Sequence, residues 1–244
     1  MSNYDLVIFD LDGTVLRTDE AIAYCTLQTL REVLPGEMPG IELEIQKLIA
    51  TGNTLDDTFS RLGVRDDLIS QCVARYREIY SVESDDLCSL FDGVHETFEK
   101  LARASVKVAL LSNKGDVALQ AAVRSFKLEA YLDFAVGERN GVNPKPDPSV
   151  FHAEILPFFG LKRTDRFLMV GDTAPDIKFA HAINGDSCWV KYGFGLPEIC
   201  EPLQPTFAVE KMTDVIGITV GRPRNKEFTC SKVRRNHGTS EAPW

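Results

Sequence analysis

The chain has 244 residues, 44% of them apolar, and a formal net charge of −9. This length and apolar content suffice for one large domain, or for a core domain with a small insertion, and exclude a globally disordered chain. The acidic balance argues against nucleic acid or an anionic membrane as the main partner. An anionic substrate would therefore need a local cation in its binding site.

The charge is unevenly distributed. Residues 222–244 contain six Lys or Arg and two Glu, a balance of +4, which leaves −13 on residues 1–221. This basic tail lacks apolar periodicity and is predicted to be disordered. The six cysteines form no C-x-x-C pair and no Cys/His cluster with zinc spacing, so reduced thiols are expected. No secretory signal and no apolar run of membrane-spanning length is visible, which predicts a cytoplasmic location.

The first predicted element is a strand. Leu6, Val7, Ile8 and Phe9 follow one another without a polar residue, as in a strand buried on both faces, and the turn signal Asp12-Gly13-Thr14 ends it. Residues 18–81 instead show helical patterns and no strand pattern. The four predicted helices run from the N-cap Thr18 to Pro35-Gly36, over Ile41–Ile49, from Asn53 or Thr54 to Leu62, and over Asp66–Tyr80.

Helices and strands alternate after Gly93. Helices are predicted at 94–104, 117–126, 148–159 and 174–183, and strands at 106–111, 134–136, 167–170 and 187–190. Alternation of this kind predicts an α/β fold with a Rossmann-like parallel sheet core, into which an α-helical cap is inserted after the first strand. The predicted domains are the core (residues 1–16 and 88–220), the cap (residues 17–87) and the tail (residues 221–244).

Polar residues follow three of the predicted strands: Asp10 with Asp12, Ser112 with Asn113, and Asp172. Ligands of open α/β sheets bind at the carboxyl ends of the strands, so these side chains are expected to converge. Asp176 lies four residues after Asp172, on the same face of the following helix. Carboxylates so close together need a cation between them, and hard oxygen ligands with a phosphate substrate favour Mg²⁺.

A lysine lies in a stiff loop before the helix at 148–159. The segment is Asn143-Pro144-Lys145-Pro146-Asp147-Pro148, and its three prolines restrict the backbone. A rigidly held ammonium group at Lys145 is suited to neutralising a phosphoryl oxygen.

Four segments together resemble the ordered motifs of the haloacid dehalogenase superfamily. They are Asp10-Leu11-Asp12-Gly13-Thr14, Leu111-Ser112-Asn113-Lys114, Lys145-Pro146-Asp147-Pro148 and Gly171-Asp172-Thr173-Ala174-Pro175-Asp176. The resemblance covers about residues 4–215 and is specific because all four motifs occur in order. It is greatest to the phosphoglycolate phosphatase-like branch, which has a helical cap after the first strand and a segment similar to Lys191-Tyr192-Gly193-Phe194-Gly195.

The resemblance implies a role for each motif residue. Asp10 would attack phosphorus and form an aspartyl-phosphate, and Asp12 would act as general acid and then general base. Mg²⁺ would be held by the Asp10 carboxylate, the Asp12 backbone carbonyl and Asp172, with Asp176 supporting the metal directly or through water. The phosphate-binding group would comprise Ser112, the Asn113 backbone, Lys145, and Thr14 as the residue that orients the loop.

Three further features have two interpretations each. Arg17 stands at the entry to the cap, where many relatives have Asp or Asn; it is a candidate for binding an anionic end of the substrate, or a hinge ion pair. Thr51-Gly52-Asn53 either selects the substrate or is a turn with a helix cap. Ser112-Asn113 is also predicted to cap the helix that starts at Gly115. Lys114 is a weaker candidate for substrate contact.

These residues favour a phosphatase for a small phosphorylated metabolite, with phosphoglycolate as the leading candidate by resemblance. A phosphomutase of the β-phosphoglucomutase type is the alternative enzyme. A binding protein with an inactive phosphatase fold is the alternative from another class, but the presence of Asp10, Asp12, Lys145 and Asp172 argues against it. Dehalogenation is disfavoured because Asp12 is suited to protonating an alkoxide. No nucleic-acid or membrane partner is expected, and the chain is predicted to be a monomer or a dimer.

Overall fold

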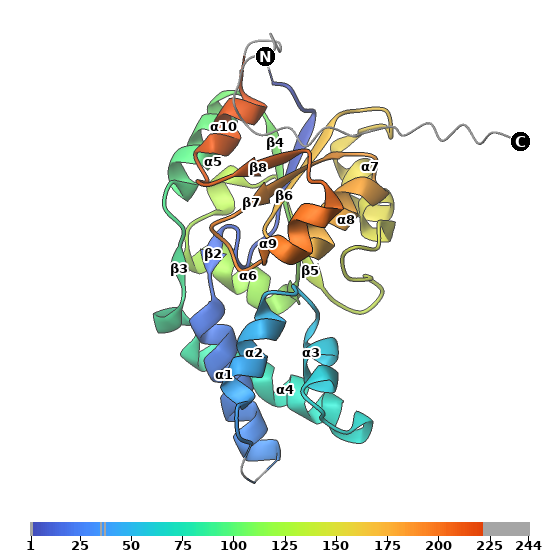
Figure 1. Ribbon diagram of the computed structural model, residues 1–244. Helices are drawn as coiled ribbons and strands as arrows, with labels where there is room; N and C mark the ends of the chain where they lie inside the picture. Colours follow the sequence, from blue (N-terminus) through green and yellow to red (C-terminus); the bar gives the residue numbers. More distant parts are fainter. Residues whose placement is uncertain (1, 35, 37, 222–244) are drawn as a thin grey trace, which may run out of the picture.

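The computed structural model describes residues 2–34, 36 and 38–221 (Figure 1). It consists of a six-stranded sheet flanked by helices and, at one end of that sheet, a group of four helices. Apart from Gly221, the predicted basic tail lies outside the described residues. No helix within the described ranges has the length and apolar character needed to cross a membrane.

The sheet is parallel throughout, as the alternating pattern predicts. Its order is β5-β4-β1-β6-β7-β8. The strands are β1 (Leu6–Phe9), β4 (Lys107–Gly115), β5 (Phe134–Glu138), β6 (Phe167–Gly171), β7 (Asp186–Val190) and β8 (Phe207–Val209). The first strand of the chain therefore lies near the middle of the sheet, between β4 and β6.

Helices cover both faces of the sheet, which explains the uninterrupted apolar run of β1. Val7 and Phe9 pack toward α5 (Val94–Arg103), α6 (Asp116–Ser125) and α10 (Asp214–Thr219). Leu6 and Ile8 pack toward α7 (Leu156–Phe159) and α8 (Ala174–Ala182) on the opposite face. The short α9 (Pro197–Cys200) follows β7. Each residue of β1 is buried, so the strand is a fixed base for the residues that follow it.

The cap contains α1 (Asp19–Val33), α2 (Ile41–Ile49), α3 (Leu55–Arg61) and α4 (Asp66–Glu83), and these helices share an apolar cluster of their own. The chain enters the cap through β2 (Leu16–Arg17) and leaves it through β3 (Ser89–Leu90), which pair in an antiparallel two-stranded sheet. Entry and exit therefore lie side by side, as a hinge between two bodies requires.

The structure corrects one capping prediction. Strand β4 continues to Gly115, and Gly115 is itself the N-cap of α6, without a side-chain cap. The prediction that Ser112-Asn113 caps this helix is wrong, because both residues still belong to the strand and Asn113 bonds to other loops. Thr18 does occupy the N-cap position of α1, but its hydroxyl makes no cap hydrogen bond. Strands β2, β3 and β8 were not predicted, since two or three residues show no periodicity.

Candidate active site

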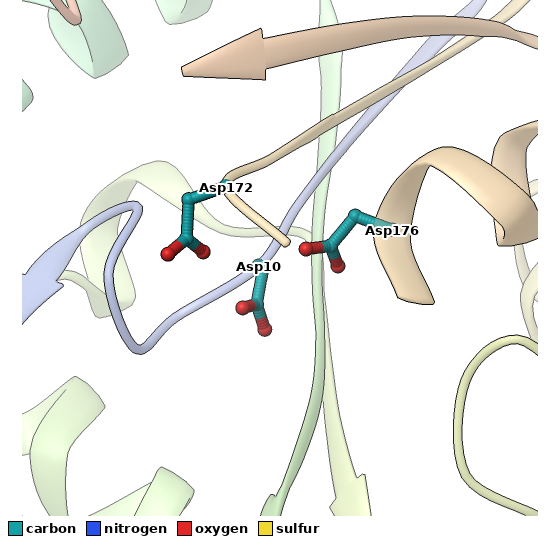
Figure 2. A group of neighbouring side chains, drawn as sticks. All are labelled: Asp10, Asp172 and Asp176. Atoms are coloured by element: carbon teal, nitrogen blue, oxygen red, sulfur yellow. The ribbon is translucent and has the colours of Figure 1, made fainter. Parts of the chain in front are cut away.

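Three carboxylates converge at the carboxyl edge of the sheet (Figure 2). Asp10 follows β1, Asp172 follows β6, and Asp176 lies in the first turn of α8. All three are buried, and one oxygen of each lies within 4.8 Å of the others. The convergence expected from the sheet topology is therefore present in the structure.

Lys145 lies between two of these carboxylates. Its Nζ is 2.7 Å from Asp10 Oδ1 and 2.7 Å from Asp176 Oδ1, and its side chain is only 2% exposed. The contact with Asp176 is also a hydrogen bond, whereas the contact with Asp10 has the distance of an ion pair but not the angles of a hydrogen bond. Burial alone would lower the pKa of Lys145, but the charges of Asp10 and Asp176 outweigh it and raise that pKa, so the ammonium stays charged.

Asp176 is held on both oxygens. While Oδ1 accepts from Lys145, Oδ2 accepts from the backbone N–H of Thr173 at 3.0 Å and from its hydroxyl at 2.9 Å, which forms a capping box at the start of α8. This arrangement fixes the position of Lys145. It also favours the interpretation that Asp176 supports a metal through water.

Asp172 is oriented by two loops, the one after β1 and the one after β7. Thr14 donates its hydroxyl to Oδ1 at 3.1 Å, and the backbone N–H of Phe194 donates to Oδ2 at 2.8 Å. A Cβ on Gly13 would lie 2.1 Å from Asp172 Oδ2, so only glycine allows the loop after β1 to pass this close. Thr14 therefore fixes Asp172 and does not line the cavity described below, and its expected part in phosphate binding stays a prediction.

Burial shifts the pKa of two of the carboxyl groups. Desolvation is the largest cause for Asp10, whose pKa is raised to about 7 although Lys145 opposes the shift. Desolvation, then the charges of Asp176 and Asp10, raise the pKa of Asp172 well above its ordinary value. Both shifts arise first from burial, and the charges of the neighbouring carboxylates add to them.

The donor set fits a hard divalent cation. Buried carboxylate oxygens near one another, with raised pKa values, are suited to Mg²⁺, which would be held by Asp10 and Asp172. The third ligand implied by the resemblance, the backbone carbonyl of Asp12, stays a prediction. The Asp12 side chain is not part of this carboxylate cluster.

We expect Mg²⁺ to bind more tightly at about pH 8 than at about pH 6. The pKa of Asp10 is raised in the metal-free fold, so the folded protein binds this proton more tightly than the unfolded chain does. The contribution of Asp10 to the free energy of unfolding therefore falls as pH rises toward 7. Mg²⁺ must displace the proton below pH 7, which lowers its affinity by up to about tenfold per pH unit. Titration calorimetry at both pH values measures this, with Asp10→Asn as control. Equal affinity at both would contradict the prediction.

The predicted phosphate-binding residues of β4 lie beside Lys145. The Asn113 side chain accepts from the Lys145 backbone N–H at 2.7 Å and donates to the Lys145 carbonyl at 3.2 Å, so it fixes the lysine loop. The same Nδ2 donates to the carbonyl of Gly52 in the cap at 3.1 Å. Ser112 Oγ accepts from the Lys114 backbone N–H at 3.2 Å. Asn113 thus joins the site to the cap loop between α2 and α3.

Gly52→Ala is expected to lower kcat/KM by about tenfold, because an added Cβ would lie 2.3 Å from Thr173 Oγ1 and lift the cap loop off the core. Gly63→Ala is the matched control: it also has a positive φ, but no atom lies within 4 Å of its added Cβ. Both variants bear the same backbone strain. Steady-state kinetics and thermal unfolding of both variants separate the loss of kcat/KM from the loss of stability. An equal loss of kcat/KM in both variants would contradict the importance of the close contact between Gly52 and Thr173.

Lys114 has a role that sequence reasoning did not find. Its Nζ lies 3.2 Å from each oxygen of Asp12 and 3.9 Å from the centre of the Tyr80 ring in α4, and its side chain is 7% exposed. The ammonium is therefore held between the predicted general acid and the cap. Its position directly after Asn113 is the sequence signal, but Asp12 and Tyr80 become its neighbours only in the fold.

Arg17 lies apart from this group. It is exposed, its guanidinium lies 5.1 Å from the centre of the Phe91 ring, and it does not line the cavity that contains Asp10. The assignment of Arg17 as a substrate-binding residue therefore finds no support, and the described residues give it no ion pair at the hinge. Asn53, in the cap loop, does line the cavity.

Comparisons with known proteins agree with this geometry. The pyrophosphatase PpaX of Bacillus cereus (strain B4264) is 27% identical over 214 residues, which cover 87% of this chain and 94% of that protein. Among solved structures, a predicted phosphoglycolate phosphatase from Haemophilus somnus 129PT has a TM-score of 0.78 at 21% identity, covering 89% of this chain and 99% of the other. A haloacid dehalogenase-like family protein from Streptococcus pneumoniae has a TM-score of 0.76 at 22% identity, covering 88% and 97%.

At these identities the two solved structures show the fold alone. The family model for haloacid dehalogenase-like hydrolases matches residues 7–190, a span that contains the four motifs, the whole cap and the convergent carboxylates. This chain belongs to the haloacid dehalogenase-like hydrolase family.

Proposed function

We propose that this protein is a Mg²⁺-dependent phosphatase that hydrolyses a small organic phosphate monoester through an aspartyl-phosphate on Asp10. The observation that carries the proposal is the buried group of Asp10, Lys145 and Asp172 at the carboxyl edge of the sheet. A nucleophilic carboxylate, a fixed ammonium and a set of hard oxygen ligands are the parts that phosphoryl transfer to a protein carboxylate requires.

The proposed reaction has two steps. An Asp10 carboxylate oxygen attacks phosphorus while the bond from phosphorus to the alcohol oxygen breaks, and Asp12 donates a proton to that oxygen. Asp12 then takes a proton from water, whose oxygen attacks phosphorus and breaks the bond to Asp10. Ser112, the Asn113 backbone and Lys145 hold the phosphoryl oxygens. Bound Mg²⁺ would offset the negative charge on those oxygens.

Two candidate substrates are each supported by a specific similarity. Phosphoglycolate was predicted by resemblance to its branch of the superfamily. Pyrophosphate is the second candidate, because several Bacillus relatives at 26–27% identity are named pyrophosphatase PpaX. The inactive binding protein is not supported, since the residues it should have lost are present and assembled.

A substrate screen tests the proposal. Purified protein with Mg²⁺ is incubated with phosphoglycolate, sugar phosphates, nucleotides and pyrophosphate, and phosphate release is measured beside the Asp10→Asn variant. Release by the wild type alone supports a phosphatase. Isomerisation of a sugar phosphate without release supports the mutase, and a folded protein that releases phosphate from no substrate argues against the proposal.

A further inference from the structure

One cavity of about 630 Å³ extends from Asp10 into the cap. Its core end contains Asp10, Ser112 and Lys145. In-line attack by Asp10 places the leaving oxygen on the side of phosphorus opposite to the attacking carboxylate, so the leaving group extends away from Asp10 into this cavity. The cap side of the cavity carries a cluster of apolar and aromatic side chains, among them Ile22, Ile45, Leu48, Ile49, Leu55 and Tyr76, together with polar residues such as Thr58, Ser81 and Ser84.

The cationic residues that line this cavity already have anionic partners. Lys145 pairs with Asp10 and Asp176, and Lys114 contacts both oxygens of Asp12. At the exposed rim, Arg77 pairs with Glu138, and Arg139 pairs with Glu154 and Asp116. Among the described lining residues every cation has an anionic partner, so a second anionic group on the substrate would have to compete with these carboxylates.

The formal charge of the site also disfavours a second anionic group on the substrate. Four carboxylates lie around the proposed reaction centre with two ammonium groups, a formal charge of −2. The carboxylates are Asp10, Asp12, Asp172 and Asp176, and the ammonium groups are Lys114 and Lys145. One divalent cation would neutralise this charge. The phosphate ester then adds its own negative charge. A carboxylate or second phosphate on the leaving group would have to enter an apolar, partly enclosed region without a partner.

Two uncharged polar groups without hydrogen-bond partners are buried beside the cavity. Thr26 is fully buried and its hydroxyl has no hydrogen-bond partner among the described residues. The amide Nδ2 of Asn53 is likewise buried and unpaired, and it lies at the cavity wall. Buried polar groups without partners are uncommon in folded proteins, and these two lie just beneath the surface of the cavity.

Resting on the proposed phosphatase function, we propose that the preferred substrate is a phosphate ester of an uncharged, largely apolar alcohol. A leaving group that carries a carboxylate or a phosphate is rejected. The apolar cap wall and the cations that are already paired select an uncharged leaving group over a charged one. Phosphoglycolate and pyrophosphate, the two candidates named above, are therefore both poor substrates.

Matched substrates test this. Benzyl phosphate is compared with 4-carboxybenzyl phosphate, which adds a carboxylate to the leaving group. The second pair, 2-phosphoglycolamide and 2-phosphoglycolate, differs in charge at nearly equal size. With the Mg²⁺-loaded wild type, kcat/KM is expected to be at least about tenfold higher for the uncharged member. Equal or higher values for the charged members, or a preference for pyrophosphate, would overturn the inference and indicate that Lys114 leaves Asp12 to bind the second anion.

A cap variant gives a gain-of-function test. Ile49→Lys places a cation on the apolar wall, and is expected to shift the benzyl to carboxybenzyl ratio of kcat/KM by about tenfold toward the charged ester. Ile49→Met, of similar length without charge, should leave the ratio unchanged. An unchanged ratio in a folded Ile49→Lys protein contradicts the assignment of this wall to the leaving group.

Binding separates the two proposals. Affinities of the Asp10→Asn variant for benzyl phosphate and 4-carboxybenzyl phosphate are measured by calorimetry, independently of turnover. Tighter binding of the uncharged ester with no hydrolysis by wild type would retain the specificity and reject the phosphatase. Hydrolysis with the opposite preference would retain the phosphatase and reject the specificity.

Discussion

Asp10→Asn is expected to lower the rate of phosphate release by about 10⁴-fold or more, the scale found when an enzyme loses its nucleophile. The neutral amide cannot form the aspartyl-phosphate, and the other groups of the site then have no covalent step to assist. Steady-state phosphate release with the best substrate of the screen measures the loss. Residual activity within tenfold of wild type would rule out Asp10 as the nucleophile.

The same substitution is expected to stabilise the metal-free protein above pH 7. Burial raises the pKa of Asp10 to about 7, so keeping this carboxylate charged at pH 8 destabilises the fold. Each pKa unit corresponds to about 1.4 kcal/mol, and the raised pKa already includes the attraction of Lys145, so we expect a gain on the order of a few kcal/mol. Urea unfolding with a chelator measures it. The gain should shrink toward pH 5, where Asp10 is protonated in the fold.

Among the substitutions proposed for this protein, Lys145→Met is expected to cause the largest loss of unfolding free energy. It removes the ammonium that lies 2.7 Å from Asp10 and from Asp176 and leaves two buried carboxylates without a counter-charge. Breaking a buried pair in this way destabilises by about 3–5 kcal/mol. Because the carboxylates can take up protons, the loss of unfolding free energy should be smaller at about pH 5 than at about pH 8.

Phosphate release by Lys145→Met is expected to fall as well, since Lys145 is the one ammonium group that contacts Asp10 in the described part of the chain. The control is Lys178→Met, on the same helix as Asp176 but exposed, for which the described residues show no ion pair. Urea unfolding and kinetics of the two variants are compared. Equal stability of both would contradict the bridging position of Lys145.

The sequence by itself determined the α/β core and the convergence of the carboxylates at the edge of its sheet. The run Leu6–Phe9 is apolar throughout because helices cover both faces of the sheet, so its pattern carried the fold class directly. Asp10 and Asp172 follow parallel strands that are neighbours, β1 and β6, and such residues must meet at one edge whatever the loops between them do. Local order along the chain was enough for these conclusions.

Only the tertiary structure decided the partners of Lys114 and the character of the cap wall. Lys114 and Asp12 are 102 positions apart, and the Tyr80 ring reaches them from a third element. Arg17 is close to Asp12 in sequence, yet it points out of the site toward Phe91. Motif spacing places residues on strands and loops, but which side chains then share a cavity depends on how the cap packs against the core, and that packing joins residues with no regular separation along the chain.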